Sequence, residues 1–403
     1  MKSIAGLRTL LSSDNERFRH GLPKALEDYI LDAYGISLES SYGGHLIRNP
    51  FGKASGQLSL NNQQVEHDVE AGLGFVVLKT LIAEDESGGQ SMKAWAIPEA
   101  RMKVERIVAK RPDATDAEGW TVTWKGRGWS GSLEDYIEFF DHSLTTTSST
   151  RTLVVPSCKY HLPQPGESIW RETEYNYTTQ RLLATWQKHR SDAMPIEKDF
   201  SPTLAGDANF SSVKETIREW LKEVPRLIRA AAGKENISVG LKIFNAQFED
   251  DFQVELLRAS DIADAEYRAD YLIYGNRLFD PSKEFEGKVG VAYGGPDLSA
   301  RNLKILSQYR PQLPFSATGN ITSGSEALEY LKCGATSFQM HTLFQLPDTE
   351  FAMTTGSRTV RALHRLLFHP EHGFITAILD LAELESIILP VTIPSLISFF
   401  SLK

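Results

Sequence analysis

Two lysines end stretches of apolar residues that have the character of buried strands. Lys79 closes GFVVLK over 74–79, and Lys242 lies in VGLKIF over 239–244. A buried ammonium group is rare unless an anion accompanies it, so a lysine at the end of such a strand indicates an anion-binding site. A structural salt bridge across the strands is the alternative. We expect both lysines to face one pocket and to stabilise negative charge there.

Residues 312–345 have the pattern strand, turn, helix, strand, turn. The first strand runs into Thr318-Gly319-Asn320, and the second ends at His341-Thr342. Backbone N–H groups at a glycine-bearing turn and at a helix N-terminus form a ready phosphate cradle. Two such turns after successive parallel strands are typical of the phosphate site of a (β/α)8 barrel. An ordinary βαβ unit without a ligand has similar turns, so the pattern alone leaves both possibilities open.

Cys158, in VVPSCKYHL over 154–162, is the candidate for moving a proton. A thiol acts as a base only when something lowers its pKa or keeps water away from it. A single cysteine is otherwise a small buried hydrophobe. His161 and Tyr160 are the neighbouring alternatives. We expect Trp129, Ser130, Tyr160 and Tyr274 to line an aromatic substrate pocket.

Alternating strands and helices from about residue 41 onward predict a parallel α/β fold. We expect a helical extension over 1–40, a (β/α)8 barrel over 41–370, and a C-terminal tail over 371–403 that packs on the barrel or on a partner subunit. Two segments look inserted, around 83–128 and 159–209. The first has the character of a hairpin or flap, and the second that of a long loop covering a site or contacting a partner.

The composition is ordinary for a globular protein of 403 residues, with 41% hydrophobic and 24% charged residues. A net charge of −9 argues against a nucleic-acid surface. Two cysteines cannot build a disulfide framework, so we expect a reducing, cytoplasmic environment. The apolar C-terminal stretch is broken by two prolines and is too short for a comfortable membrane span.

Several motifs, taken in order, resemble the dihydroorotate dehydrogenase family, particularly its class 1A branch. They are NPFGKASG (49–56), GFVVLKT (74–80), YLIYGNRLF (271–279), Gly294-Gly295 and ATGNITSGSEALEYLKCGATSFQMHT (317–342). The resemblance implies FMN as the cofactor and a cysteine base at Cys158. It implies flavin and phosphate contacts at Ala54, Ser55, Gly56, Lys79, Thr80, Lys242, Gly275, Gly294, Gly295, Thr318, Gly319, Asn320, His341 and Thr342.

The chain departs from the family where the family binds orotate. Asparagines that hold the pyrimidine are replaced near Val155, Tyr160, Gly128 or Trp129, and Leu272. Each lost hydrogen bond to a buried polar group costs about 1–3 kcal/mol, so orotate is disfavoured. The family normally has glycine at the places of Asn320 and His341. Asparagine tolerates positive φ and can keep the turn, whereas His341 either contacts the phosphate or clashes with it.

We therefore predict an FMN-dependent oxidoreductase related to dihydroorotate dehydrogenase. It would transfer a hydride between flavin N5 and a carbon next to a carbonyl or amide, in a small substrate other than orotate. An electron donor or acceptor and a homodimer are the expected partners. The alternatives are a genuine dihydroorotate dehydrogenase with unusual substrate contacts, an inactive flavin-carrying barrel, and a barrel that binds another phosphorylated ligand.

Overall fold

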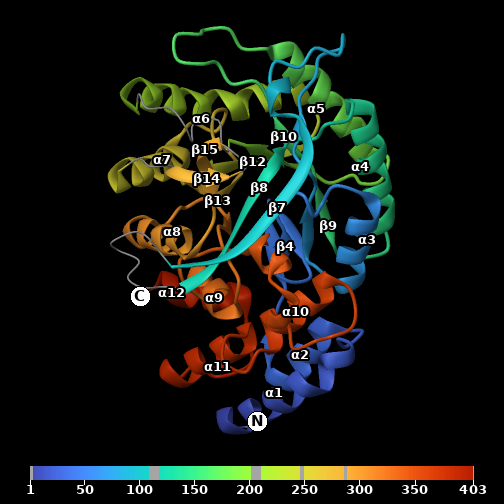
Figure 1. Ribbon diagram of the computed structural model, residues 1–403, viewed down its shortest axis with the longest axis vertical. Helices are drawn as coiled ribbons and strands as arrows, with labels where there is room; N and C mark the ends of the chain where they lie inside the picture. The colour runs from blue at the N-terminus through green and yellow to red at the C-terminus, as the bar shows by residue number, and fades with distance from the viewer. Residues whose placement is uncertain (1–2, 109–117, 201–209, 246–248, 286–287, 403) are drawn as a thin grey trace.

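A ring of short parallel strands forms the centre of the molecule (Figure 1). The computed structural model describes residues 3–108, 118–200, 210–245, 249–285 and 288–402. The central strands are β4 (Phe51–Lys53), β5 (Phe75–Val77), β6 (Leu81–Ile82), β9 (Leu153–Val155), β10 (Ser157–Lys159), β11 (Met194–Asp199), β12 (Ile237–Phe244), β13 (Tyr271–Asn276), β16 (Phe315–Thr318) and β17 (Ser337–Met340).

The hydrogen-bond register closes these strands into a barrel. β17 pairs with β4, β4 with β5, and β5 with β9, while β10 pairs with both β6 and β11. β6 continues β5, and β10 continues β9 beyond Pro156, so ten short strands make eight barrel strands. Counted along the chain, these are β4, β5–β6, β9–β10, β11, β12, β13, β16 and β17. The prediction of a (β/α)8 barrel is confirmed.

Helices cover the outside of the barrel (Figure 1). They are α3 (Asn62–Ala71), α4 (Leu133–Thr147), α5 (Glu172–Gln187), α6 (Phe210–Ala232), α7 (Asp250–Ile262), α8 (Pro296–Gln308), α9 (Gly324–Lys332) and α10 (Arg358–Phe368). Local sequence fixes several of their starts. Ser132 and Asp135 form a capping box at α4, and Ser323 and Glu326 form one at α9. These caps satisfy N–H groups that have no partner within the helix.

The expected insertion over 159–209 is corrected by the structure. This segment contains α5 and β11, a covering helix and the fourth barrel strand, and residues 201–209 lie outside the described part of the chain. The charged residues Glu197 and Lys198 made β11 look like a connection. Both are buried with polar partners: Glu197 accepts a hydrogen bond from Ser157 Oγ inside the barrel, and Lys198 Nζ donates to the backbone carbonyl of Asp199.

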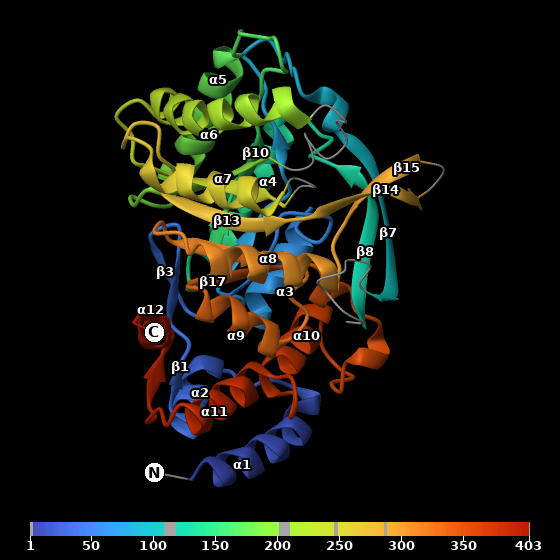
Figure 2. The ribbon, with the colours of Figure 1, turned by 90° about the vertical axis from the view of Figure 1, so that its left-hand side faces the viewer.

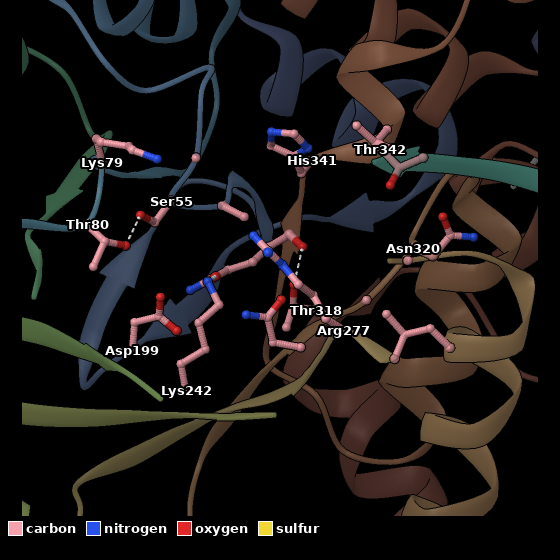
Figure 3. A pocket seen from close by; sticks show the side chains of 18 of the residues that line it. Ser55, Lys79, Thr80, Asp199, Lys242, Arg277, Thr318, Asn320, His341 and Thr342 are labelled. Carbon is pink, nitrogen blue, oxygen red and sulfur yellow. Dashed lines mark hydrogen bonds between the residues drawn. The ribbon is translucent and has the colours of Figure 1, made fainter. Parts of the chain in front are cut away.

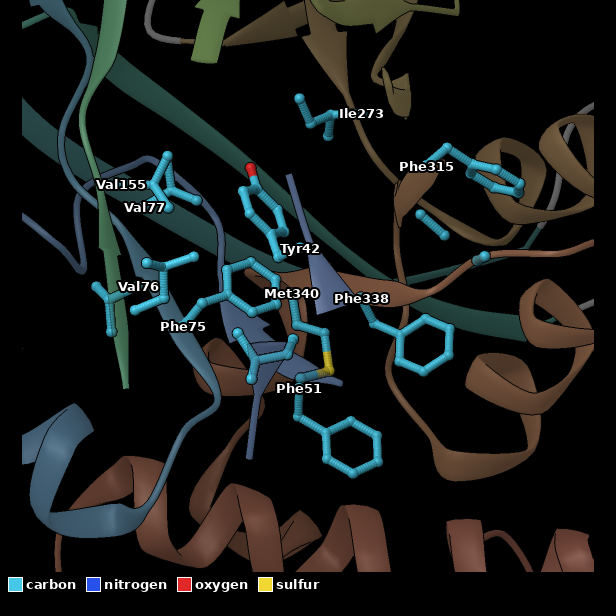
Figure 4. Close-up of a cluster of buried hydrophobic side chains, with 14 of the residues drawn as sticks. Tyr42, Phe51, Phe75, Val76, Val77, Val155, Ile273, Phe315, Phe338 and Met340 are labelled. Carbon is cyan, nitrogen blue, oxygen red and sulfur yellow. The ribbon is translucent and has the colours of Figure 1, made fainter. Parts of the chain in front are cut away.

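The core fills the barrel and the layer between strands and helices. Figure 4 shows Phe75, Val76 and Val77 of the second strand beside Phe51 and Phe338. Tyr42 enters from the short hairpin of β2 (Ser40–Tyr42) and β3 (His45–Ile47). Its ring stacks on Phe75 at a centroid distance of 4.4 Å. Each large apolar side chain buried in this way contributes about 1.5–3 kcal/mol.

The N-terminal end lies at the bottom of the molecule in Figure 2, and the C-terminal end lies at its left side, near α9. The N-terminal segment contains α1 (Ile4–Arg17), η1 (Phe18–His20) and α2 (Leu26–Tyr34). The strand β1 (Ile36–Ser37) pairs in parallel with β18 (Val391–Thr392) near the C-terminus. The tail contains α11 (Phe374–Leu384) and α12 (Ile393–Ser401). Among the helices of the described residues, none has the length and apolar character that crossing a membrane requires.

Two antiparallel hairpins lie over one end of the barrel. β7 (Ile97–Val108) and β8 (Glu118–Arg127) form a long ribbon within the expected insertion over 83–128. β14 (Leu278–Phe285) and β15 (Lys288–Tyr293) form the second hairpin, which crosses the ribbon in Figure 2. The short helices η2 (Lys93–Trp95), η3 (Thr342–Gln345) and η4 (Asp348–Glu350) lie in the connecting segments. The ribbon brings Val122 into the wall of a pocket at this end.

Candidate active site

A pocket lies at the carboxyl ends of the barrel strands (Figure 3). Parallel strands all end at the same face of such a barrel, so residues that follow different strands meet there. Twelve residues expected to hold a cofactor line this pocket: Ala54, Ser55, Gly56, Lys79, Thr80, Lys242, Gly294, Thr318, Gly319, Asn320, His341 and Thr342.

Lys79 lies between β5 and β6, on the wall that Ser55 and Thr80 also form (Figure 3). Its ammonium group donates to Gln57 Oε1 at 2.7 Å, and the side chain is buried. Burial, assisted by the positive charge of Arg277, lowers the pKa of Lys79 to about 7. The charged form is therefore disfavoured until an anion enters, which is the behaviour expected of an anion-binding lysine.

Lys242 reaches the same pocket from β12. Its ammonium group donates to Glu197 Oε1 at 3.1 Å and to Gln339 Oε1 at 2.9 Å, and only about 3% of the residue is exposed. Here the structural salt bridge considered as an alternative for this lysine is present. The salt bridge does not remove Lys242 from the pocket, because Lys242 also lines the cavity.

The Gly319-Asn320 turn has the backbone conformation that its sequence indicates. Gly319 has φ +106°, and a Cβ there would lie 2.6 Å from both Asn302 Nδ2 and the Gly275 carbonyl oxygen. Asn320 has φ +60°, which asparagine tolerates. Its side-chain Oδ1 is buried and has no hydrogen-bond partner among the described residues. An amide that lines a pocket with an unsatisfied atom indicates that a ligand completes its bonding.

His341 occupies a place where glycine was expected from the resemblance. Its ring packs so closely on Gly56 that a Cβ at Gly56 would lie 2.9 Å from Cδ2. Burial, assisted by the charges of Arg277, Lys53, Lys79 and Lys242, lowers the pKa of His341 to about 3. The ring is neutral at physiological pH and adds no charge to the pocket.

The pocket also contains residues that the sequence analysis did not select. Lys159 ends the third barrel strand, Asp199 ends the fourth and Asn276 ends the sixth, which Arg277 follows. Lysine and arginine outnumber acidic groups four to one among the described lining residues. Positive charge in a partly enclosed cavity attracts anions. Lys159 and Asp199 could have been predicted from their positions at the ends of β10 and β11, but only if these two segments had been recognised as barrel strands.

Cys158 is not in the pocket, and this corrects its predicted role. Successive side chains of a strand point to opposite faces. Ser157 points into the barrel, where its hydroxyl donates to Glu197, so Cys158 points outward toward the helices. The thiol is fully buried, and burial raises its pKa to about 12. The structure therefore gives it neither access to the cavity nor the lowered pKa that a base requires.

The other predicted proton carriers lie on the same outer side. Tyr160 is fully buried, stacks on Tyr175, and hydrogen-bonds Thr179 Oγ1 at 2.7 Å. Burial raises the pKa of its hydroxyl well above the ordinary value. His161 is buried beside Glu167, with 3.6 Å between Nε2 and Oε1, and burial lowers its pKa. Neither side chain lines the cavity.

Among the described residues, those predicted to form an aromatic substrate pocket do not line the cavity at the strand ends. Trp129 stacks on Phe139 of α4 at a centroid distance of 5.6 Å, and Ser130 is exposed. Tyr274 is fully buried, and its neighbours include Arg301 of α8 and Gln253 of α7, outside the barrel wall. Tyr274 lies on β13, where side chains alternate between the two faces of the strand, and its own side chain lies on the outer face.

Gly275 and Gly295 support the pocket without lining it. The Gly275 carbonyl accepts a hydrogen bond from Asn302 Nδ2 at 3.0 Å, which fixes the end of β13. Gly295 is the N-cap of α8, and a Cβ there would lie 2.7 Å from Ile107 Cδ1 of the ribbon. Gly295 therefore permits close contact between the ribbon and the barrel rim.

Comparison by sequence matches no family model and no curated protein. Comparison by structure finds the crystal structure of DHODH in complex with ferulenol from Eimeria tenella, where DHODH denotes dihydroorotate dehydrogenase. The match has a TM-score of 0.58 and 12% sequence identity, and it covers 96% of this chain and 94% of that chain. The fold is that of DHODH. At this identity the likeness establishes the fold alone, so an activity has to be argued from the pocket.

Proposed function

We propose that the protein is an FMN-dependent oxidoreductase with the DHODH fold. It would exchange a hydride with a carbon next to a carbonyl or amide in a small substrate other than orotate. One observation carries the proposal. Lys79, Lys242 and the Gly319-Asn320 turn come from three different barrel strands and line a single pocket at their carboxyl ends.

The residues present fit FMN in charge and shape. The backbone N–H groups of the Gly319-Asn320 turn and the Thr342 hydroxyl would donate to a phosphate. The unsatisfied Asn320 Oδ1 is an acceptor, so its partner would be a donor such as a ribityl hydroxyl of FMN. Ala54 and Ser55 are small residues of the pocket wall against which a planar ring can lie, whereas the His341 ring already packs on Gly56. Lys79 and Lys242 would stabilise negative charge on the ring. When bound, FMN supplies the hydride chemistry, which no side chain can perform alone.

The chain itself has to supply proton transfer, and we propose Asp199 for this role in place of Cys158. Asp199 is the acidic residue among the described lining residues, and it lies beside Lys242, on the same side of the view as Lys79 and Thr80 (Figure 3). A carboxylate at the end of a barrel strand is placed where substrates of such barrels bind. Lys79, which donates a hydrogen bond to Gln57, would hold its ammonium group in a fixed position near Asp199 while Asp199 transfers the proton.

A phosphate-binding barrel without flavin is the second candidate. Arg277 and His341 both line the cavity. Arg277 is not among the contacts that the resemblance implies, and the family normally has glycine at the place of His341. The Arg277 guanidinium group and the buried His341 ring could together leave room only for a phosphorylated ligand smaller than FMN. A genuine dihydroorotate dehydrogenase is the further alternative. The homodimer and the cytoplasmic location stay predictions.

The test is the visible spectrum of the purified protein, followed by release and mass analysis of any chromophore. FMN with bands near roughly 375 and 450 nm would support the proposal. Bleaching by dihydroorotate would favour the genuine dehydrogenase. A colourless protein that refuses added FMN but binds inorganic phosphate would favour the second candidate and overturn the flavin proposal.

A further inference from the structure

A buried carboxylate lies directly beneath the pocket, inside the barrel. Glu197 of β11 has no exposed surface. Four side chains donate hydrogen bonds to it. Gln339 Nε2 lies 2.6 Å from Oε2, Lys242 Nζ lies 3.1 Å from Oε1, Ser157 Oγ lies 3.3 Å from Oε1, and Tyr42 Oη lies 3.4 Å from Oε2. Each donor comes from a different part of the chain, so the barrel as a whole holds this charge.

Two of these donors belong to the pocket wall. Lys242 and Gln339 both line the cavity, and they also bond to each other, with Lys242 Nζ 2.9 Å from Gln339 Oε1. Glu197, Gln339 and Lys242 therefore form a closed triangle of hydrogen bonds. The triangle leaves the ammonium group of Lys242 at the cavity, in one fixed position.

A second connection runs from Glu197 to the opposite wall. Ser157 Oγ lies 3.2 Å from Thr80 Oγ1, which in turn lies 2.7 Å from Ser55 Oγ. Thr80 and Ser55 line the cavity. The carboxylate is thus joined by short polar links to both sides of the predicted flavin site, although it does not itself line the pocket.

A buried carboxylate without a partner would cost several kcal/mol, so the position is retained only with its donors in place. Charges interact strongly in this low-dielectric interior. Glu197 places one negative charge 3.1 Å from the lysine that faces the ligand. The net charge of the Glu197–Lys242 pair is close to zero, whereas the hydrogen bond of Lys79 goes to the neutral amide of Gln57.

We infer that Glu197 is a positioning residue that sets the reduction potential of bound FMN by holding Lys242 and opposing its charge. The inference rests on the proposed function. Reduction adds negative charge to the flavin, and an unopposed Lys242 would favour that charge more than the pair does. Glu197 therefore makes the bound flavin harder to reduce.

The experiment measures the two-electron midpoint potential of the FMN-loaded protein with a redox dye as reference. Glu197→Gln should raise the potential, changing the ratio of reduced to oxidised flavin at a fixed potential by about tenfold or more, which is about 30 mV for two electrons. Asp68→Asn is the matched control. Asp68 is a fully buried carboxylate paired with Lys53, and it belongs to α3 on the outside of the barrel.

Two further variants separate charge from packing. Glu197→Asp keeps the charge but withdraws it from Lys242, so the potential should rise less than in Glu197→Gln. If Glu197→Gln fails to fold, the potential of Glu197→Asp tests the inference in its place. Glu197→Gln should have a smaller effect in a Lys242→Met background, because the two residues act through each other.

The outcomes distinguish the inference from the function on which it rests. A shift in Glu197→Gln no larger than that in Asp68→Asn, or an equal effect in both backgrounds, would overturn the inference while FMN remains bound. A wild-type protein that takes up no FMN would overturn the proposed function and the inference with it.

Discussion

At the scale of single residues, Lys79 should make cofactor binding depend on pH. Its pKa is lowered to about 7, so the side chain loses its proton above that pH in the ligand-free protein. An anionic ligand favours the ammonium form, so binding above pH 7 must take up a proton. We expect the FMN dissociation constant to increase by up to about tenfold per pH unit between about pH 7.5 and 9. Quenching of FMN fluorescence measures this constant.

Lys79→Met is the comparison for this dependence. The variant should bind FMN more weakly at pH 7 and should show a nearly flat profile over the same range, because the FMN phosphate is already fully ionised there. The ligand-free wild-type protein should also gain stability as pH rises from about 7 toward about 10.4, since the unfolded chain binds the additional proton in that window. Parallel profiles for wild type and variant would exclude Lys79 as the titrating group.

Cys158 should be inert in the folded protein. Its thiol is fully buried and its pKa is raised to about 12, whereas Cys333 is partly exposed with a pKa raised to about 11. A thiol reagent at neutral pH should label Cys333 slowly and Cys158 only after denaturation. Peptide mass analysis assigns the labelled residue. Fast modification of Cys158, or loss of flavin reduction in Cys158→Ala, would restore the base role that its outward position argues against.

At the scale of elements, the root of the β7–β8 ribbon should depend on Gly128. This residue has φ +48°, and a Cβ there would lie 2.6 Å from Ile82 Cδ1 and 2.9 Å from the Trp95 carbonyl oxygen. Gly88 has φ +81° with nothing within 4 Å. Gly88→Ala should cost about 1–2 kcal/mol from backbone strain alone. Gly128→Ala should cost more and weaken FMN binding, as measured by urea unfolding and FMN titration.

Equal losses in the two alanine variants would mean that only backbone conformation matters at Gly128. The ribbon would then not depend on its close contact with the second barrel strand. A larger loss of FMN affinity than of stability in Gly128→Ala would instead indicate that the ribbon acts mainly as a wall of the pocket, through Val122.

Sequence reasoning succeeded for elements whose pattern is local. The apolar run before Lys79 and the glycine turn at Gly319 have characteristic residues at fixed spacing, and Lys79 and Gly319 line the same pocket. β11 was missed because Glu197 and Lys198 are charged. Their burial depends on partners such as Gln339 and Tyr42, which are distant in the chain. No local pattern encodes those partners.

Most residues expected to contact the cofactor line the pocket, whereas the residues expected to contact the substrate do not. The residues expected to contact the cofactor lie in turns, and glycine and asparagine in a sequence are typical of turns. Proton and substrate contacts depend on which face of a strand a residue occupies, and a one-residue error exchanges the faces. Cys158 and its neighbour Lys159 illustrate this, because the cysteine points outward and the lysine lines the pocket.

At the scale of the whole molecule, the C-terminal tail supports the seam that closes the barrel. Phe374 of α11 is fully buried and packs edge-to-face on Phe51 of the first strand at a centroid distance of 5.1 Å. It also lies 6.3 Å from Phe338 of the eighth strand. These two strands pair with each other, so one side chain from the tail covers the junction between the first and last barrel strands.

Phe374→Ala should therefore destabilise the folded chain by about 3–5 kcal/mol, the usual cost of removing a buried phenylalanine. Ile388→Ala is the matched control in the same tail, because Ile388 is 77% exposed, and its loss should change stability by less than about 0.5 kcal/mol. Urea unfolding at several protein concentrations measures both. If the tail served only a contact between subunits, Phe374→Ala would alter the concentration dependence and leave the unfolding of the single chain unchanged. A large, concentration-independent loss places the tail within the barrel's own core.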